Sequence, residues 1–268
     1  MRWGERAILG GLVLAVMSTT VVMVGRQLDL KKEQDTFGML REKVEEQKNR
    51  SDFSAPLVVE GTAGAVEEDT IDERAMLEEY QELYKENTDF AGWITIEGTN
   101  IDYPVMQNLA DREYYLHRDF YKRDSYAGVP FVGTGDMNLE EGPLFLYGHN
   151  MKNGTMFADL LNYQSKDYWE KHSEVLLDTL WDHRQYKIFA VLRVSEKEWT
   201  DHTGLFYSGL DDYQKDGRDI IKELKDRAIY ETGTTPSSPI SLLYLITCSY
   251  QQKNERFVVV AERADPLT

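Results

Sequence analysis

The chain has 268 residues, of which 41% are hydrophobic, so it is long and apolar enough to bury a sizeable core. The formal net charge of -17 argues against nucleic-acid binding, because a nucleic-acid protein needs a basic face to release counterions. A single cysteine excludes an intramolecular disulfide, and the five histidines show no H-x-x-x-H or H-x-H spacing, so no metal and no cofactor is predicted.

The N-terminus contains an apolar stretch, residues 7–24, with 18 residues and no charge. As a helix it would be roughly 27 Å long, which is close to the thickness of the hydrocarbon core of a bilayer. A cleaved signal peptide is the alternative, but no A-x-A-like site lies closely downstream. Residues 1–26 are therefore predicted to be a single transmembrane anchor. Basic residues flank both ends, so the positive-inside rule does not decide its orientation.

Residues 27–70 are predicted to be a charged stalk and a linker. Residues 27–50 are highly charged with scattered apolar positions, which is typical of a solvated helix, and a role as a partner helix is the less favoured alternative. Residues 51–70 are rich in glycine, alanine, serine and acidic residues, as linkers are. The folded domain is then predicted to span residues 71–268.

This domain is predicted to begin with an amphipathic helix and to continue as a mainly β fold. The helix has five apolar residues on one face, and we expect that face to pack on the strands of the domain: Ile71, Leu77, Tyr80, Leu83 and Tyr84. Eight short strand-like runs come next, at residues 92–96, 101–105, 128–132, 144–148, 174–180, 186–194, 241–248 and 256–262. Helical patterns are inserted after the fourth run and at residues 212–230. The pattern is typical of an antiparallel sheet or barrel, and a closed barrel would leave no exposed strand edge.

Cys248 ends the seventh run and is the candidate nucleophile. A buried structural thiol is the alternative, because free cysteines are among the residues most often buried. An isolated thiol is only about 3% ionised at pH 7, so a nucleophile needs a partner. His149 comes after an apolar strand and before a glycine-bearing loop, and no other histidine has a better claim. Arg256 opens the last strand, and its guanidinium becomes a neighbour of the thiol if the last two strands pair as a hairpin.

The motifs YGHNM…GTMFADL, LLYLITC and RFVVVAER, preceded by DFAGWITIEGTNIDYPVMQ and YYLHRDF, resemble those of a class B sortase. Class B sortases are membrane-anchored cysteine transpeptidases of Gram-positive bacteria. The resemblance covers about residues 71–263 and implies the sortase β-barrel of about eight strands, with the N-terminal helix packed on it. It also implies that the catalytic domain is extracytoplasmic and lies behind the single-pass membrane anchor.

The resemblance assigns roles to individual residues. His149, Cys248 and Arg256 take the positions of the catalytic histidine, cysteine and arginine. The same resemblance places three residues along the peptide groove: Leu116, Ile246 and Ser249. Because Ser249 and Tyr250 come directly after the cysteine, no acid that would orient the histidine is assigned.

Such an enzyme would cleave the C-terminal sorting motif of a surface protein. The thiolate would attack a carbonyl to form a thioacyl enzyme, the histidine would protonate the leaving amine and later deprotonate the incoming one, and the arginine would hold the oxyanion. The acceptor would be the amine of a peptidoglycan precursor or a pilin lysine. The alternatives are a pilus-polymerising sortase, a plain cysteine peptidase that hydrolyses the same bond, and a non-catalytic anchored binding module.

Overall fold

The structure is a computed structural model. It describes residues 3–51, 75–138, 142–195, 198, 220–238, 241–249 and 255–264, and within the first helix it describes no side chains before Met23. The chain forms two units, residues 1–40 and residues 41–268. In the part of the chain that is described, no helix is both long enough and apolar enough to cross a membrane. Most of the predicted anchor, residues 7–22, has its side chains outside that part.

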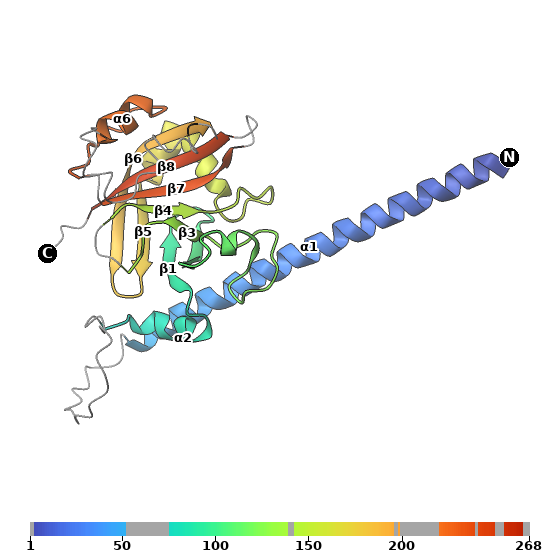
Figure 1. Cartoon of the computed structure of the whole chain (residues 1–268), viewed down its shortest axis with the longest axis horizontal. Coiled ribbons are helices and arrows are strands. Elements are labelled where there is room, and N and C mark those ends of the chain that lie inside the picture. The colour runs from blue at the N-terminus through green and yellow to red at the C-terminus, as the bar shows by residue number, and fades with distance from the viewer. Residues whose placement is uncertain are drawn as a thin grey trace, which may run out of the picture. The chain divides into compact units, whose positions relative to one another are not determined.

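In the described residues of the second unit, eight strands form a closed barrel (Figure 1). Their order around the barrel is β1-β2-β3-β4-β7-β8-β6-β5. The strands are β1 (Phe90–Thr95), β2 (Asp102–Met106), β3 (Phe131–Thr134), β4 (Leu144–Tyr147), β5 (Glu174–Thr179), β6 (His183–Ser195), β7 (Leu242–Ser249) and β8 (Glu255–Arg263). The predicted closed barrel of eight strands is therefore confirmed.

Six of the eight strand pairs are antiparallel, as the sequence predicts, but β2 with β3 and β4 with β7 are parallel. The parallel pairing of β4 with β7 spans a long connection that includes two other strands and several helices. Parallel neighbours need such a crossover, whereas a short turn can join only antiparallel strands. This pairing places the end of β4 beside the end of β7.

Several helices accompany the barrel. They are α2 (Glu78–Glu86), the short 3-10 helices η1 (Tyr114–His117) and η2 (Ala158–Gln164), α3 (Lys166–Lys171) and α6 (Ile220–Arg227). Both α2 and α6 bury apolar side chains. Tyr80 and Leu83 of α2 are fully buried, and the Tyr80 ring lies 5.6 Å from the Phe90 ring of β1, so the packing predicted for these two residues is confirmed. Ile71 lies outside the described residues, and Leu77 comes directly before the helix. Of the helix predicted at 212–230, residues 212–219 lie outside the described residues, and residues 228–230 are not helical, so the helix ends earlier than predicted.

The long helix α1 (Trp3–Ser51) confirms the predicted helicity of residues 27–50, but its last turns, from Arg41 on, belong to the second unit. In that unit Val44 is only 5% exposed, and the Lys48 ammonium lies 3.6 Å from the Asp178 carboxylate. Residues 41–51 therefore differ from a solvated stalk, because an apolar side chain and several basic ones find partners in the domain.

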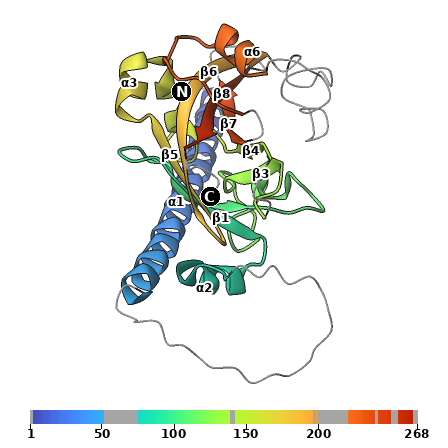
Figure 2. The ribbon, with the colours of Figure 1, turned by 90° about the vertical axis from the view of Figure 1, so that its left-hand side faces the viewer.

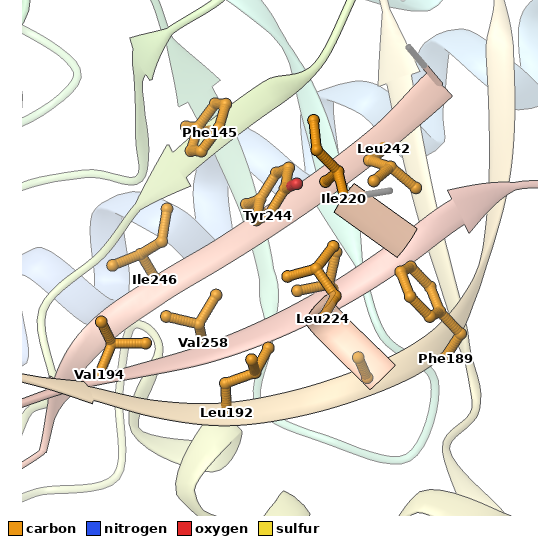
Figure 3. Packing of buried hydrophobic residues seen from close by; sticks show 12 residues of the cluster. Phe145, Phe189, Leu192, Val194, Ile220, Leu224, Leu242, Tyr244, Ile246 and Val258 are labelled. Atoms are coloured by element: carbon orange, nitrogen blue, oxygen red, sulfur yellow. The ribbon is translucent and has the colours of Figure 1, made fainter. Parts of the chain in front are cut away.

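One buried cluster lies where α6 covers β6, β7 and β8, and both views show these elements together (Figure 1 and Figure 2). Figure 3 shows Ile220 and Leu224 of α6 among alternate residues of the strands. On β7 these are Leu242, Tyr244 and Ile246. Successive side chains on a strand point to opposite faces, so the next residue on this face of β7 is Cys248. The packed cluster therefore ends at the thiol.

Candidate active site

The ends of β4 and β7 are held together beyond the last ladder pair. Tyr147 of β4 pairs with Ile246 of β7, and continuing this register sets His149 level with Cys248. Three hydrogen bonds maintain the pairing: Gly148 N donates to the Ile246 carbonyl at 3.1 Å, Thr247 Oγ1 donates to the Gly148 carbonyl at 2.7 Å, and Asn150 Nδ2 donates to the Cys248 carbonyl at 3.0 Å. The candidate base and the candidate nucleophile are thus presented by adjacent strand ends.

Cys248 and Arg256 are neighbours across the antiparallel pair of β7 and β8. Arg256 Nη1 lies 3.5 Å from Cys248 Sγ, which is within hydrogen-bond range for sulfur. Both residues are half-buried, and every other residue of β7 is buried. The hairpin expected from the sequence is therefore present, and the thiol sits at the surface of the core rather than inside it.

His149 is half-buried and contacts the segment at the end of η1. Its Nε2 lies 3.0 Å from the Leu116 carbonyl. A carbonyl can only accept, so Nε2 carries a hydrogen and Nδ1 is the nitrogen that gains or loses a proton. Burial lowers the pKa of His149, the bond to Leu116 opposes this, and the nearby His117 lowers the pKa further. The imidazole is therefore biased towards its neutral form.

The three residues predicted along the peptide groove are placed differently. Leu116 is half-buried and touches the site through its carbonyl. Ile246 is 1% exposed and belongs to the cluster under α6, and Ser249 is 3% exposed. The burial of Ile246 and Ser249 argues against direct contact between their side chains and a peptide, because their position inside the barrel wall leaves little surface to bind.

Two residues near the site were not identified from the sequence. His117 stacks on His149, with ring centroids 5.5 Å apart and planes 29° apart. Asn150 is 8% exposed and binds the backbone of the nucleophile. Asn150 is the residue directly after the candidate histidine, which is a signal that could have found it. His117 lies in the YYLHRDF motif directly after Leu116, which is the signal that could have found it.

No metal-binding group is found in the described part of the chain, where no three histidine, cysteine, aspartate or glutamate side chains converge in a suitable way. The chemistry available to the site is that of a partly exposed thiol, a guanidinium beside it and an imidazole on the adjacent strand. These are the parts of a nucleophilic cysteine site with a general acid–base and an oxyanion donor.

A closed barrel that carries this kind of cysteine site defines the class of protein. The Sortase domain family model matches residues 94–264, which is more than half of the chain. The chain belongs to the sortase family, as its motifs predict.

Comparison with individual relatives indicates the class of sortase. Sortase B of Listeria monocytogenes is 31% identical over 170 residues, which cover 60% of this chain and 63% of the relative. Sortase B of Staphylococcus aureus is 27% identical over 171 residues, covering 62% of this chain and 67% of the relative. The match thus spans slightly less than two thirds of the Listeria protein.

Solved structures of sortase B also resemble this chain. The X-ray structure of Clostridium perfringens sortase B is 32% identical, with a TM-score of 0.59, covering 69% of this chain and 99% of that one. A Staphylococcus aureus sortase B–substrate complex, at 23% identity and a TM-score of 0.67, covers 89% of this chain and 99% of that one and shares the fold. All these relatives are sortases B, so the predicted class is confirmed.

Proposed function

We propose that this sortase is a cysteine transpeptidase that cleaves a C-terminal sorting motif and transfers the surface protein to a cell-wall amine through a thioacyl enzyme. The contact between Cys248 Sγ and Arg256 Nη1, two half-buried residues near the end of the β7–β8 pair, is the observation that carries the proposal. A structural cysteine would have no need of surface exposure or of a guanidinium neighbour. A binding module would have no need of a nucleophile.

In the first half-reaction, the Cys248 thiolate attacks the carbonyl carbon of the scissile peptide bond. The carbonyl oxygen becomes an oxyanion, which accepts hydrogen bonds from Arg256. The carbon–nitrogen bond then breaks, the leaving amine takes a proton from His149 Nδ1, and a thioester remains on the cysteine. In the second half-reaction, the acceptor amine attacks the thioester, His149 takes its proton, and the thiolate leaves.

The protonation states limit the rate of this cycle. With ordinary pKa values near 8.5 for a thiol and 6.5 for an imidazole, under about 1% of molecules at pH 7 would hold both a thiolate and an imidazolium. The pKa of His149 is lowered by burial, which makes the imidazolium scarcer still in the free enzyme. The productive pair therefore has to form by proton transfer when substrate is bound, or the enzyme turns over slowly.

The partners are set by the same proposal. The donor is the sorting-motif peptide of a secreted surface protein, and the acceptor is the amine of a peptidoglycan precursor. Residues 1–26 are proposed as a membrane anchor on the strength of their sequence, with the catalytic domain, residues 71–268, outside the cell. A pilin lysine as acceptor would make the enzyme a pilus polymerase, and water as acceptor would make it a peptidase.

The test is to incubate the purified protein with a library of sorting-motif peptides and to search by mass spectrometry for an acyl group on Cys248. We expect a thioester that disappears when an amine is added and is replaced by an amide product. The Cys248→Ala variant should form no adduct while keeping the melting temperature of the wild type within a few degrees, because little core volume is lost. Absence of any adduct in the wild type would contradict the proposal, and a product that only water captures would favour the peptidase.

A further inference from the structure

We propose that His117 is a positioning residue for the active-site imidazole: its stacked ring holds the plane of the His149 ring, and a proton on His117 opposes the proton that His149 carries at Nδ1. This inference rests on the role proposed for His149. It adds a second histidine to a site for which the sequence predicts only His149.

The same short segment makes both contacts with the His149 ring. Leu116 supplies the carbonyl that accepts the Nε2 hydrogen, and His117, the last residue of η1, supplies the stacked ring. The hydrogen bond to this carbonyl fixes the position of Nε2, but by itself it would still allow the imidazole ring to rotate about that bond. A stacked ring at 5.5 Å restricts this rotation. The two contacts together hold the direction in which Nδ1 points.

The segment that carries His117 is itself held in place. The His117 carbonyl accepts a hydrogen bond from Ser125 N at 3.1 Å, and the Tyr115 carbonyl accepts one from Val129 N at 3.2 Å. Gly128 has φ +60 and packs so closely that an added Cβ would lie 2.6 Å from the Leu116 carbonyl oxygen. A side chain there would push this oxygen, and with it the bond to His149, so the position requires glycine.

The charges around the two rings favour a competition for protons. Arg118 is adjacent to His117 and pairs with Asp124, so its charge is partly balanced. On the strands, the Arg256 guanidinium lies at the site and contacts the thiol. Two imidazolium rings stacked at 5.5 Å would repel each other, because like charges at such a distance disfavour the doubly charged state.

The consequence concerns the resting enzyme. A proton on His117 makes a proton on His149 less favourable. His149 Nδ1 is then free to accept a proton from the thiol or from the incoming amine. A neutral His149 is what the deacylation step requires, since the acceptor amine must lose a proton to it.

The experiment measures the titration of His149 by NMR of its ring carbons in the full-length protein, without substrate. Four proteins are compared: wild type, His117→Phe, His117→Gln and His117→Arg. Phenylalanine keeps a stacked ring but carries no charge. Glutamine has neither the ring nor the charge. Arginine keeps a planar group and carries a permanent charge. We expect the pKa of His149 to rise in the first two variants and to fall in the arginine variant.

His172→Phe is the matched control. His172 also has a ring nitrogen near a backbone carbonyl, with Nδ1 2.8 Å from that of Glu97, and its ring packs at a tilt on Tyr168 of α3 instead of on the site. The titration of His149 should be the same in this variant as in the wild type. An unchanged pKa of His149 in both His117→Phe and His117→Gln would overturn the charge competition.

The stacking part of the proposal is tested by kinetics. The kcat of His117→Gln should fall roughly 3-fold or more below that of His117→Phe at the pH optimum of each, with similar KM, because only glutamine loses the ring that holds His149. Equal kcat values would overturn the positioning role. Because the titration needs no turnover, a shift of the His149 pKa in a protein that never forms a thioester would count against the transpeptidase alone.

Discussion

Two histidines of the second unit, His149 at the end of β4 and His183 at the start of β6, show how different surroundings shift the pKa of an imidazole in opposite directions. His183 Nδ1 lies 2.9 Å from an Asp178 oxygen and its Nε2 lies 3.5 Å from a Glu79 oxygen. The bond and charge of Asp178 raise the pKa of His183 against the effect of burial. His149 is paired with a carbonyl and with another imidazole, and its pKa is lowered. The carboxylate partner of His183 accounts for the difference between the two pKa shifts.

The same comparison distinguishes the structural cluster around His183 from the reactive site around Cys248. Around His183 the charges satisfy each other: burial opposes ionisation of Asp178, but hydrogen bonds from His183 and Tyr80 outweigh it and lower the pKa of Asp178. A cavity of about 600 Å³ adjoins this cluster, yet Asp178 and His183 in its wall are already paired. At the other site, a half-buried thiol and a half-buried guanidinium contact each other at the end of a strand pair. Cavity volume alone is therefore a poor guide to the chemistry.

Arg256 should show the largest effect of substitution at the chemical site. If its planar fork holds the oxyanion, both Arg256→Ala and Arg256→Lys should lower kcat/KM by about 10²–10³, the usual cost of one well-placed oxyanion donor. If it only supplies charge to the thiolate, lysine should keep most of the activity. Steady-state kinetics, together with the rate of Cys248 alkylation against pH, distinguishes these roles.

Arg193→Lys is the control for this pair of variants. Arg193 lies on the neighbouring strand β6, 3.4 Å from Glu255, and a lysine there retains the charge. We expect kcat/KM within a few fold of the wild type. An Arg256→Lys variant that is equally active would sink the oxyanion role, and an alkylation pKa that rises in both Arg256 variants would assign the guanidinium to the thiolate.

Asn150 should show an intermediate effect, through the position of the nucleophile. Asn150→Ala removes the hydrogen bond to the Cys248 carbonyl and leaves that end of β7 free to shift relative to β4. We expect kcat to fall roughly 10-fold with little change in KM, because a small misplacement of a reacting atom is costly. The free energy of unfolding should fall by about 1 kcal/mol.

Asn153→Ala is the matched control, since Asn153 lies in the same loop and its side chain bonds to Thr155, at 2.8 Å and 3.3 Å, instead of to the nucleophile. Its kcat should stay near that of the wild type. Equal losses in the two variants would mean that Asn150 acts on the loop as a whole and not on Cys248.

The sequence predicts some parts of this site and not others, for reasons of distance along the chain. The pairing of Cys248 with Arg256 was predictable, because two alternating strands joined by a short connection form a hairpin whose register is set by their pattern. The identity of His149 came from its place after a strand and from the family resemblance. The parallel pairing of β4 with β7 and the stacking of His117 on His149 depend on tertiary packing, which periodicity does not report. The burial of Ile246 likewise depends on a cluster to which β4, β6, β8 and α6 contribute in the folded chain.

The smallest effect is expected at the structural histidine, and its pH dependence is the informative part. A folded-state pKa raised above the unfolded value, as for His183, contributes stability that is present below about pH 6.5 and is lost as the pH rises through the folded value. The lowered pKa of Asp178 contributes stability that is lost as the pH falls through its own folded value. The pair should therefore stabilise the protein most between about pH 4 and pH 6.5.

His183→Gln tests this window by urea unfolding at pH 5.5 and pH 9. The His183 side chain is 57% exposed, so the loss at pH 5.5 should be no more than about 1 kcal/mol, as for other solvent-screened ion pairs. At pH 9 the loss should be smaller, because the wild-type imidazole is then neutral. His172→Gln is the control, since its ring contacts a carbonyl instead of a carboxylate, and its effect should differ less between the two pH values. A loss for His183→Gln that is equal at both pH values, or larger at pH 9, would show that the Asp178 contact is an ordinary hydrogen bond, and the contrast with His149 would then rest on burial alone.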